Sequence, residues 1–357
     1  MRSVAGAHVH APPHPNRVIR IRRKSIALAL QGGGSHGAYT WGVLDRLLEE
    51  DHLDIDAISG ASAGAMNAAV LAHGMTSGGR DGARAALDRF WRRISTASGL
   101  FAAWESAWQD ETPALRALTT LSTFLSPAQL NPLALNPLRE ILAEELDIER
   151  IRTACPTDLF ISATQVRTGS LRVFDRSELT LDVLLASACL PRLHPPVAIQ
   201  GEAYWDGGLS ANPAVLPLLE QPRTRDIVFV TLLPARQASP TTVCGISQRL
   251  SEIAFGSAFL AELRWLALAK RIAGGRLFGF GVTGRLKRLS LHVIDGGSIA
   301  SGLGPHSQVN TARSFLERLR ARGHADTDAW LHRNYGAIGR RSTVALESYL
   351  QPATAEA

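Results

Sequence analysis

The run AISGASAGAMNAAVLA, residues 57–72, decides how this chain folds. It starts as an apolar segment of strand length, passes through a G-x-S-x-G turn at Gly60–Gly64, and continues with small residues of helical character. In such a strand–turn–helix element, the serine takes a strained backbone conformation that lifts its hydroxyl above the sheet, and the flanking glycines avoid collisions. The pattern therefore predicts that Ser62 is a nucleophile.

A glycine-rich loop, GGGSHG at residues 32–37, follows a strand predicted at 25–30 and precedes an amphipathic helix. Its spacing fits G-x-G-x-x-G, the fingerprint of dinucleotide-binding folds, at Gly32, Gly34 and Gly37. In those folds an acid at the end of the second strand binds the ribose. Here Asp54 and Asp56 precede that end, which carries the Ser62 turn instead, so the dinucleotide interpretation is disfavoured.

The loop fits a second interpretation, an oxyanion hole. Consecutive glycines at a helix N-terminus expose backbone N–H groups, which can stabilise the charge that develops on an attacked carbonyl oxygen. Because the first two strands of a parallel βαβ unit are usually neighbours, the loop and the Ser62 turn are expected to open at the same carboxyl edge of the sheet.

A serine hydroxyl is a weak nucleophile until a base takes its proton, so Ser62 needs a partner. A strand predicted at 202–205 leads directly into Asp206-Gly207-Gly208, and this carboxylate could act as the base if burial raises its pKa. The same tripeptide recurs at Asp295, after a strand predicted at 289–294. Either aspartate could therefore supply the base.

The glycine loop at 32–37, the Ser62 turn and Asp206-Gly207-Gly208, in this order, resemble the three motifs of the patatin-like phospholipase family. The resemblance covers roughly residues 25–233. It implies a three-layer α/β/α fold with a mostly parallel central sheet and an inserted helical cap. It also implies hydrolysis of lipid esters through an acyl-enzyme, by a Ser–Asp dyad without histidine. The implied site residues are the nucleophile Ser62, the base Asp206, the oxyanion-hole residues Gly32, Gly33 and Gly34, and the motif glycines Gly37, Gly60, Gly64, Gly207 and Gly208.

The resemblance also bears on two further positions. Asn212-Pro213 resembles the family's continuation after its aspartate, which favours Asp206 over Asp295 as the base. Asp295 is then a turn residue that caps a strand end. The family loop usually carries Lys or Arg before its last glycine, whereas this chain has His36. A neutral His36 would weaken any electrostatic contribution of that cation but would leave the backbone donors intact.

Composition bounds the remaining expectations. The 357 residues are 45% hydrophobic and 20% charged, with a net charge of +6, and no apolar run reaches the roughly 18 residues of a membrane span. Three scattered cysteines favour a reducing, cytoplasmic setting, with peripheral contact to an anionic membrane surface as an option. No metal, cofactor or nucleic-acid partner is expected, because a serine mechanism needs only a lipid or other ester substrate.

The predicted organisation is a disordered basic tail over 1–24, a catalytic core over 25–235 and a helical and strand extension over 236–357, which packs on the core. The core includes the cap, at about 95–137. Local patterns further predict a loop over 74–85 and a single helix over 138–151.

Two other functions compete with the dyad enzyme. One is an α/β-hydrolase with a triad of Ser62, Asp206 and either His292 or His306, although that fold usually reaches its nucleophile only after several strands. The other is a catalytically silent membrane-docking protein, suggested by the basic N-terminus and by the aromatic residues between Phe101 and Phe124.

Overall fold

The computed structural model describes residues 23–109, 136–191, 193–220, 225–234, 239–275, 281–300, 302–303 and 307–345. The predicted basic tail lies almost wholly outside these residues, as does the middle of the predicted cap, and both stay predictions.

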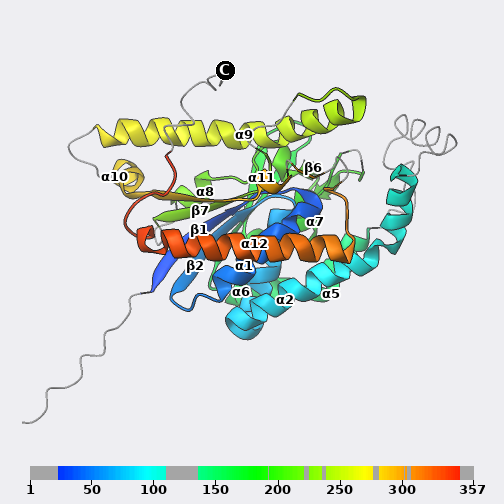
Figure 1. Cartoon of the computed structure of the whole chain (residues 1–357), viewed down its shortest axis with the longest axis horizontal. Helices are drawn as coiled ribbons and strands as arrows, with labels where there is room; N and C mark the ends of the chain where they lie inside the picture. Colours follow the sequence, from blue (N-terminus) through cyan, green and yellow to red (C-terminus); the bar gives the residue numbers. More distant parts are fainter. Residues whose placement is uncertain are drawn as a thin grey trace, which may run out of the picture.

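A mostly parallel sheet forms the central layer (Figure 1). The strands β8, β7, β1, β2 and β3 run parallel to their neighbours, whereas β4, β5 and β6 pair antiparallel. The predicted α/β class with a mostly parallel sheet is thus confirmed. Each strand pairs with the next in the series β5 (Val197–Ile199), β6 (Glu202–Asp206), β3 (Asp158–Gln165), β2 (Leu53–Gly60), β1 (Lys24–Leu30), β7 (Asp226–Thr231) and β8 (Ser290–Asp295), and β4 (Leu171–Asp175) also pairs with β3.

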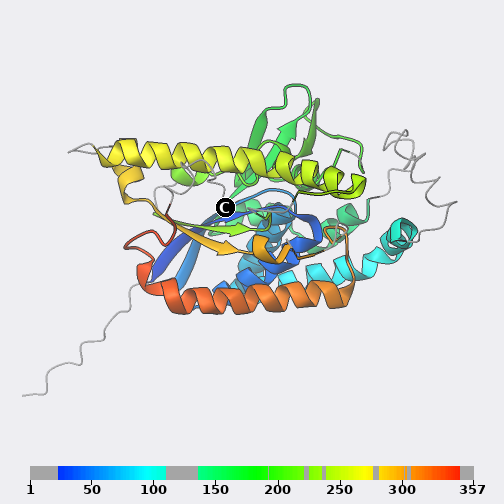
Figure 2. The ribbon, with the colours of Figure 1, turned by 45° about the horizontal axis from the view of Figure 1, so that its top comes forward.

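Helices cover both faces of this sheet. Helices α1 (Gly37–Leu48), α2 (Ala63–Gln109) and α12 (Arg313–Asn334) lie on one face, and α9 (Val243–Gly274) lies on the other (Figures 1 and 2). The central strand β1 explains this layering, because it is apolar on both sides. Its residues Ile26, Leu28 and Leu30 join the core formed with α1 and α2, while Ala27 and Ala29 pack with Phe259 and Leu263 of α9.

The shorter elements complete the two outer layers and the connections. The helices are α5 (Pro137–Glu145), α6 (Ile148–Ala154), α7 (Leu181–Ser187), α8 (Leu216–Glu220), α10 (Gly281–Arg288) and α11 (Gly297–Ala300). The 3₁₀ turns are η1 (Gly34–His36), η2 (Arg176–Glu178), η3 (Gly207–Leu209) and η4 (Tyr335–Ala337). None of the described helices combines the length and the hydrophobicity needed to cross a bilayer.

The C-terminal part of the chain contributes to the same body. Strand β8 extends the central sheet beside β7, and α12 packs along α1. Buried Asp45 on α1 accepts a charged hydrogen bond of 2.7 Å from Arg320 on α12 and another of 2.7 Å from Arg84 on α2. The predicted boundary near residue 235 stays a prediction.

Two local predictions were wrong. Residues 74–85 are helical within α2 apart from a sharp break at Gly78 and Gly79, because the glycines at 74 and 82 serve the close packing of its two helical parts. The single helix predicted over 138–151 is divided into α5 and α6. Leu146 is extended, and the Asp147 side chain caps the new helix by accepting a hydrogen bond from Arg150 N.

Candidate active site

Strand β3 brings the nucleophile and the carboxylate together. One edge of β3 pairs with β4 over residues 160–164, so β2 and β6, which each overlap that range, both occupy the other edge. Parallel β2 ends with Gly60 opposite Ile161, and antiparallel β6 ends with Asp206 opposite Ala163. The two strands therefore run toward each other and stop one residue of β3 apart, which places the Ser62 turn against Asp206.

Ser62 occupies the turn between β2 and α2 in the strained conformation that the sequence predicted. Its φ of 53° lies in the left-handed region, which non-glycine residues rarely adopt. Its amide donates to Ser187 O at 3.1 Å and to Ser187 Oγ at 3.0 Å, which fixes the turn on the end of α7. A side chain at Gly64 would overlap the backbone of Leu30, so the turn can approach β1 only with glycine there.

Asp206 is completely buried, which gives its carboxyl group an unusual proton affinity. Burial raises the pKa of Asp206 to about 7, although the hydrogen bond from the Gly208 amide and the nearby Ser62 hydroxyl act in the opposite direction. The Gly208 N–H donates to Oδ1 at 2.8 Å. Among the described residues, Oδ2 has no hydrogen-bond partner of normal geometry.

The glycine loop lies directly over Ser62. A Cβ atom on Gly32 would be 2.6 Å from Ser62 Cβ and 2.8 Å from Ala61 O, so only glycine fits at this approach. The Gly32 amide donates to Asn212 Oδ1 at 2.7 Å. In the described part of the chain, the amides of Gly33 and Gly34 have no acceptor, which leaves them as the open donors of the loop.

The other predicted motif glycines lie at the ends of the same elements. Gly37 begins α1, Gly60 ends β2, and Gly207 and Gly208 begin η3 directly after Asp206. The loop, the serine turn and the aspartate thus meet at the carboxyl edge of the sheet. The adjacency of the first two strands predicted this for the loop and the serine turn, but not for the aspartate.

His36 brings no positive charge to the loop. Its side chain is buried, and its Nε2 lies 2.9 Å from Ser307 Oγ. Burial lowers the pKa of His36 to about 4, so the ring is neutral at pH 7. Any stabilisation of an oxyanion here must therefore come from backbone amides rather than from this side chain.

An apolar pocket of about 230 Å³ opens beside Ser62. Its walls come from α2, α5 and the segment before α12, and they consist mainly of apolar side chains. The residues that define its sides are Met66, Phe90, Trp91, Ile94, Leu138, Ile141 and Val309. Such a pocket suits an alkyl or acyl chain held next to the serine hydroxyl.

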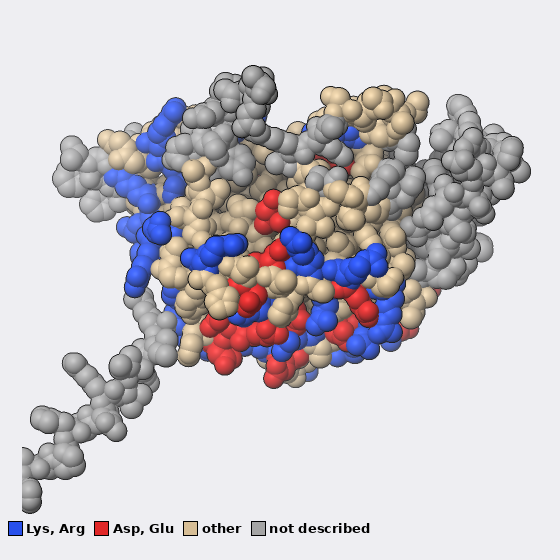
Figure 3. All heavy atoms as spheres, in the orientation of Figure 1, with Lys and Arg blue, Asp and Glu red and all other residues tan. Residues whose placement is uncertain are grey.

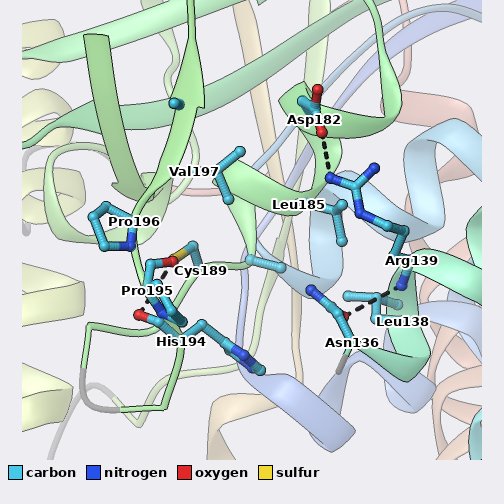
Figure 4. Close-up of a pocket in the computed structure, with 12 residues that line it drawn as sticks. Asn136, Leu138, Arg139, Asp182, Leu185, Cys189, His194, Pro195, Pro196 and Val197 are labelled. Carbon is cyan, nitrogen blue, oxygen red and sulfur yellow. Dashed lines mark hydrogen bonds and ion pairs between the residues drawn. The ribbon is translucent and has the colours of Figure 1, made fainter. Parts of the chain in front are cut away.

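A second cavity of about 280 Å³ adjoins the first and is more polar (Figure 4). The two share Asn136, Leu138, Ala188 and His194 in their walls. Its border carries the ion pair of Arg139 with Asp182, which point toward one another in Figure 4. Burial lowers the pKa of His194, which favours its neutral form.

The sequence of this chain matches the patatin-like phospholipase family over residues 28–219, more than half of its length. The chain belongs to this family. The patatin-like match spans the glycine loop, the Ser62 turn and Asp206, which the fold gathers at one edge of the sheet.

Among curated proteins, this patatin-like chain is similar to lysophospholipase NTE1 of two strains of Cryptococcus neoformans, at 27% identity over 240 residues. The aligned part is 64% of this chain but only 13% of the length of those relatives. Among solved structures it is similar to VipD of Legionella pneumophila, with 15% identity, a TM-score of 0.41, and coverage of 87% of this chain and 67% of that one. The ExoU–SpcU complex of Pseudomonas aeruginosa gives 17% identity, a TM-score of 0.32 and coverage of 92% and 75%.

The residues of the competing interpretations have other partners. His292 is fully buried, with Nε2 3.0 Å from Asp226 Oδ1 and Nδ1 3.0 Å from Thr343 Oγ1, so neither ring nitrogen is left for Ser62. His306 lies outside the described residues. Asp295 accepts hydrogen bonds from Thr231 Oγ1 and Gly297 N, as expected of a residue that caps a strand end.

The acids of the dinucleotide interpretation also lie away from the loop. Asp54 forms ion pairs with Arg23 and Arg80, and Asp56 accepts a hydrogen bond from Ser25 at the start of β1. These contacts lie toward the amino end of the sheet, whereas the glycine loop lies at its carboxyl edge. Neither Asp54 nor Asp56 is therefore placed to bind a ribose at the glycine loop.

A possible metal-binding cluster lies between α1 and α12, where the side chains of Asp45, Glu49 and His324 are close together. Arg84 already bonds both Asp45 and Glu49 at 2.7 Å. These side chains are therefore explained as an ion-pair network that ties α12 and α2 to α1.

Sequence reasoning missed two contributors to the site. The Asn212 side-chain oxygen accepts the hydrogen bond of the Gly32 amide. The Gln308 carbonyl accepts a hydrogen bond of 2.7 Å from Ser35 N. Asn212 stood in the sequence within a few residues of Asp206, but its hydrogen bond crosses 180 positions. Gln308 lies in a connection with no motif of its own, so no local pattern could have predicted it.

Proposed function

We propose that this protein is a serine lipid acyl hydrolase that cleaves carboxylic esters through an acyl-enzyme on Ser62, with Asp206 as the general base. The observation that carries the proposal is the placement of Ser62, in a strained turn, between buried Asp206 and an apolar pocket of about 230 Å³. Membership of the patatin-like phospholipase family supports the same reaction class.

Acylation follows from the geometry of these groups. Asp206 Oδ2 accepts the proton of Ser62 Oγ while Oγ bonds to the ester carbonyl carbon. The carbonyl oxygen becomes an oxyanion, which the amides of Gly33 and Gly34 stabilise. Protonated Asp206 then gives its proton to the alcohol oxygen as the carbon–oxygen bond breaks, which releases the alcohol and leaves the acyl group on Ser62.

Deacylation repeats these steps with water. Asp206 accepts a proton from the attacking water, the oxyanion forms on the same amides, and the proton returns to Ser62 Oγ as the fatty acid leaves. A carboxyl group with a pKa near 7 suits this double role, because it is deprotonated often enough to act as a base and basic enough to take the proton.

The two adjoining cavities suggest where the two parts of a lipid ester bind. The apolar pocket beside Ser62 fits the acyl chain, and the neighbouring cavity, with Arg139, Asp182 and neutral His194 at its wall, fits the polar alcohol part. A paired cation and anion suit a zwitterionic headgroup better than a lone negative charge. The similarity to lysophospholipase NTE1 supports single-chain phospholipids as the first substrates to test.

A fluorophosphonate probe tests the proposal directly. We expect the wild-type protein to be phosphonylated at Ser62, located by peptide mass spectrometry, and to hydrolyse lysophosphatidylcholine or a short-chain ester. The Ser62→Ala variant should lose both the adduct and the hydrolysis. Labelling that persists in Ser62→Ala would overturn the assignment of the nucleophile.

The pH dependence of hydrolysis offers a second prediction. Because the base must be deprotonated, kcat/KM should fall below about pH 7, by roughly tenfold per pH unit, as Asp206 takes up a proton in the free enzyme. Glu262 is the matched control, since burial also raises its pKa to about 7 while its side chain accepts a hydrogen bond from Val215 N. The pH profile of Glu262→Gln should still show the fall in kcat/KM below about pH 7. If that fall disappears in Glu262→Gln, the titrating group is Glu262 rather than Asp206, and the prediction is wrong.

A further inference from the structure

Helix α9 is apolar on two opposite faces. Its inner face buries Phe259, Leu263 and Leu266 against the sheet. Its outer face nevertheless exposes large apolar side chains, among them Val243 (85% exposed), Leu250 (63%) and Trp265 (69%). A helix that is hydrophobic all round is normally covered on all sides, so the outer face of α9 lacks a cover in the isolated chain.

The exposed side chains form a continuous stripe. Val243, Ile246, Leu250, Ile253 and Leu260 follow each other at intervals of three, four, three and seven residues, which places them on one side of the helix. At a rise of 1.5 Å per residue, this part of the stripe is roughly 26 Å long. Trp265 and Ile272 continue the exposed apolar surface toward the C-terminal end of α9.

The exposed charged residues that α9 itself carries are of one sign. The carboxylates of α9 are Glu252 and Glu262, and both turn inward, Glu252 to an ion pair with Arg249 and Glu262 to the amide of Val215. The exposed ionisable residues of the outer face are Arg264 and Arg271. The outer face thus combines apolar and basic side chains without an exposed carboxylate from α9 itself.

Helix α10 extends this character beyond the end of α9. Val282 is 75% exposed there, and Arg285, Lys287 and Arg288 are exposed on the same short helix. Figure 3 shows Lys and Arg side chains gathered at the end of the molecule where Figure 1 places α10. Basic side chains beside exposed apolar ones are typical of helices that lie in the interface of an anionic membrane.

We propose that the outer face of α9, with α10, docks this protein on an anionic lipid surface. The exposed apolar side chains would enter the headgroup region while Arg264 and Arg271 contact lipid phosphates. A second copy of the chain fits this face less well, because two-fold pairing would bring the same arginines together with no carboxylate opposite them. The proposal deepens the lipid hydrolase function proposed above and rests on it for its biological purpose.

The docking face is connected to the catalytic residues. Phe255 of α9 packs against Gly208, two residues after Asp206, and Leu233 approaches Gly256. The N-terminal half of α9 therefore lies at the carboxyl edge of the sheet, the edge that carries Ser62 (Figures 1 and 2). Docking through α9 would bring that edge close to the lipids that contain the ester.

Vesicle flotation tests this docking. We expect the wild type to float with vesicles of phosphatidylcholine and phosphatidylglycerol and to bind vesicles of phosphatidylcholine alone much more weakly. The Leu250→Glu/Ile253→Glu variant should bind at least about tenfold more weakly, because it places two carboxylates in the stripe. The matched control is Leu171→Glu, at a position on β4 that is 38% exposed, which should bind like the wild type.

Charge-reversal variants test the electrostatic contribution to vesicle binding separately from the apolar one. Arg264→Glu/Arg271→Glu should weaken binding to the anionic vesicles by about tenfold or more, whereas Arg333→Glu on α12 should not. Hydrolysis of a short soluble ester should be unchanged in all these variants, so failure of docking and failure of the hydrolase function can be told apart. Equal vesicle binding by the wild type and the Leu250→Glu/Ile253→Glu variant would overturn the proposal. A wild-type dimer that this variant converts to a monomer would assign the face to a second copy instead.

Discussion

Replacing Asp206 with Asn is expected to lower kcat for ester hydrolysis by about 10³-fold or more while the protein still folds. The amide has the shape of the carboxyl group, and its oxygen can still accept the 2.8 Å hydrogen bond from Gly208 N. It cannot take a proton from Ser62, so the hydroxyl stays a weak nucleophile. Because Asp206 is fully buried, removing its charge should not reduce stability.

Asp295 supplies the matched control for this variant. It also ends a strand, precedes two glycines and accepts a hydrogen bond of 2.9 Å from the second glycine amide, yet it caps β8 rather than facing Ser62. Asp295→Asn should therefore keep wild-type kinetics on a short-chain ester. Steady-state rates and circular dichroism of both variants decide the matter. Full activity in Asp206→Asn, or its loss in Asp295→Asn alone, would refute the dyad.

The motifs that form the site could be predicted from sequence because each is a short, continuous stretch of the chain. The strand–turn–helix pattern around Ser62 needs only its flanking glycines, and the unbroken apolar run of β1 is a local signal for a strand. The sequence also predicted that the glycine loop and the Ser62 turn lie at the same edge of the sheet, because the first two strands of a parallel unit are usually neighbours. The structure shows β1 paired parallel with β2.

The meeting of Ser62 with Asp206 could not be derived from local patterns. It depends on β6 pairing with β3 on the same edge as β2, a contact between residues about forty positions apart, with Ala163 opposite Asp206. Nothing in the periodicity of residues 202–206 specifies which strand they join. Before the structure, only the order of the motifs and their family resemblance linked the two residues.

Glycine caused the main local error, because the same residue type serves turns and close packing. The glycines between 74 and 82 favour a loop by sequence pattern, but only Gly78 and Gly79 leave the helical conformation. The outer face of α9 shows a different limit. The hydrophobic composition of this segment does not say that Leu250 and Ile253 are exposed while Leu263 is buried.

Replacing Gly32 with Ala is expected to reduce kcat by about 10²- to 10³-fold, because the added methyl group would displace the nucleophile and the loop from each other. Its Cβ would lie 2.6 Å from Ser62 Cβ, 2.8 Å from Ala61 O and 3.3 Å from Asn212 Oδ1. Relief of these contacts requires a shift of the Ser62 turn or of the loop, whose backbones are held by hydrogen bonds at Ser187 and Asn212. Either shift separates Ser62 Oγ from the open amides.

Gly33→Ala distinguishes this steric role from the role of the amides. A Cβ at Gly33 would meet Leu232 at 3.4 Å, which is close to ordinary contact, and its φ of 171° lies outside the left-handed region that favours glycine. Its N–H group remains in place, so the loss of kcat should be clearly smaller than for Gly32→Ala. The comparison uses kcat on a short-chain ester and the rate of fluorophosphonate labelling, with thermal unfolding as a check on the fold. Equal losses in the two variants would mean that the loop is sensitive to any added side chain, and that the approach of Gly32 to Ser62 is not what the reaction requires.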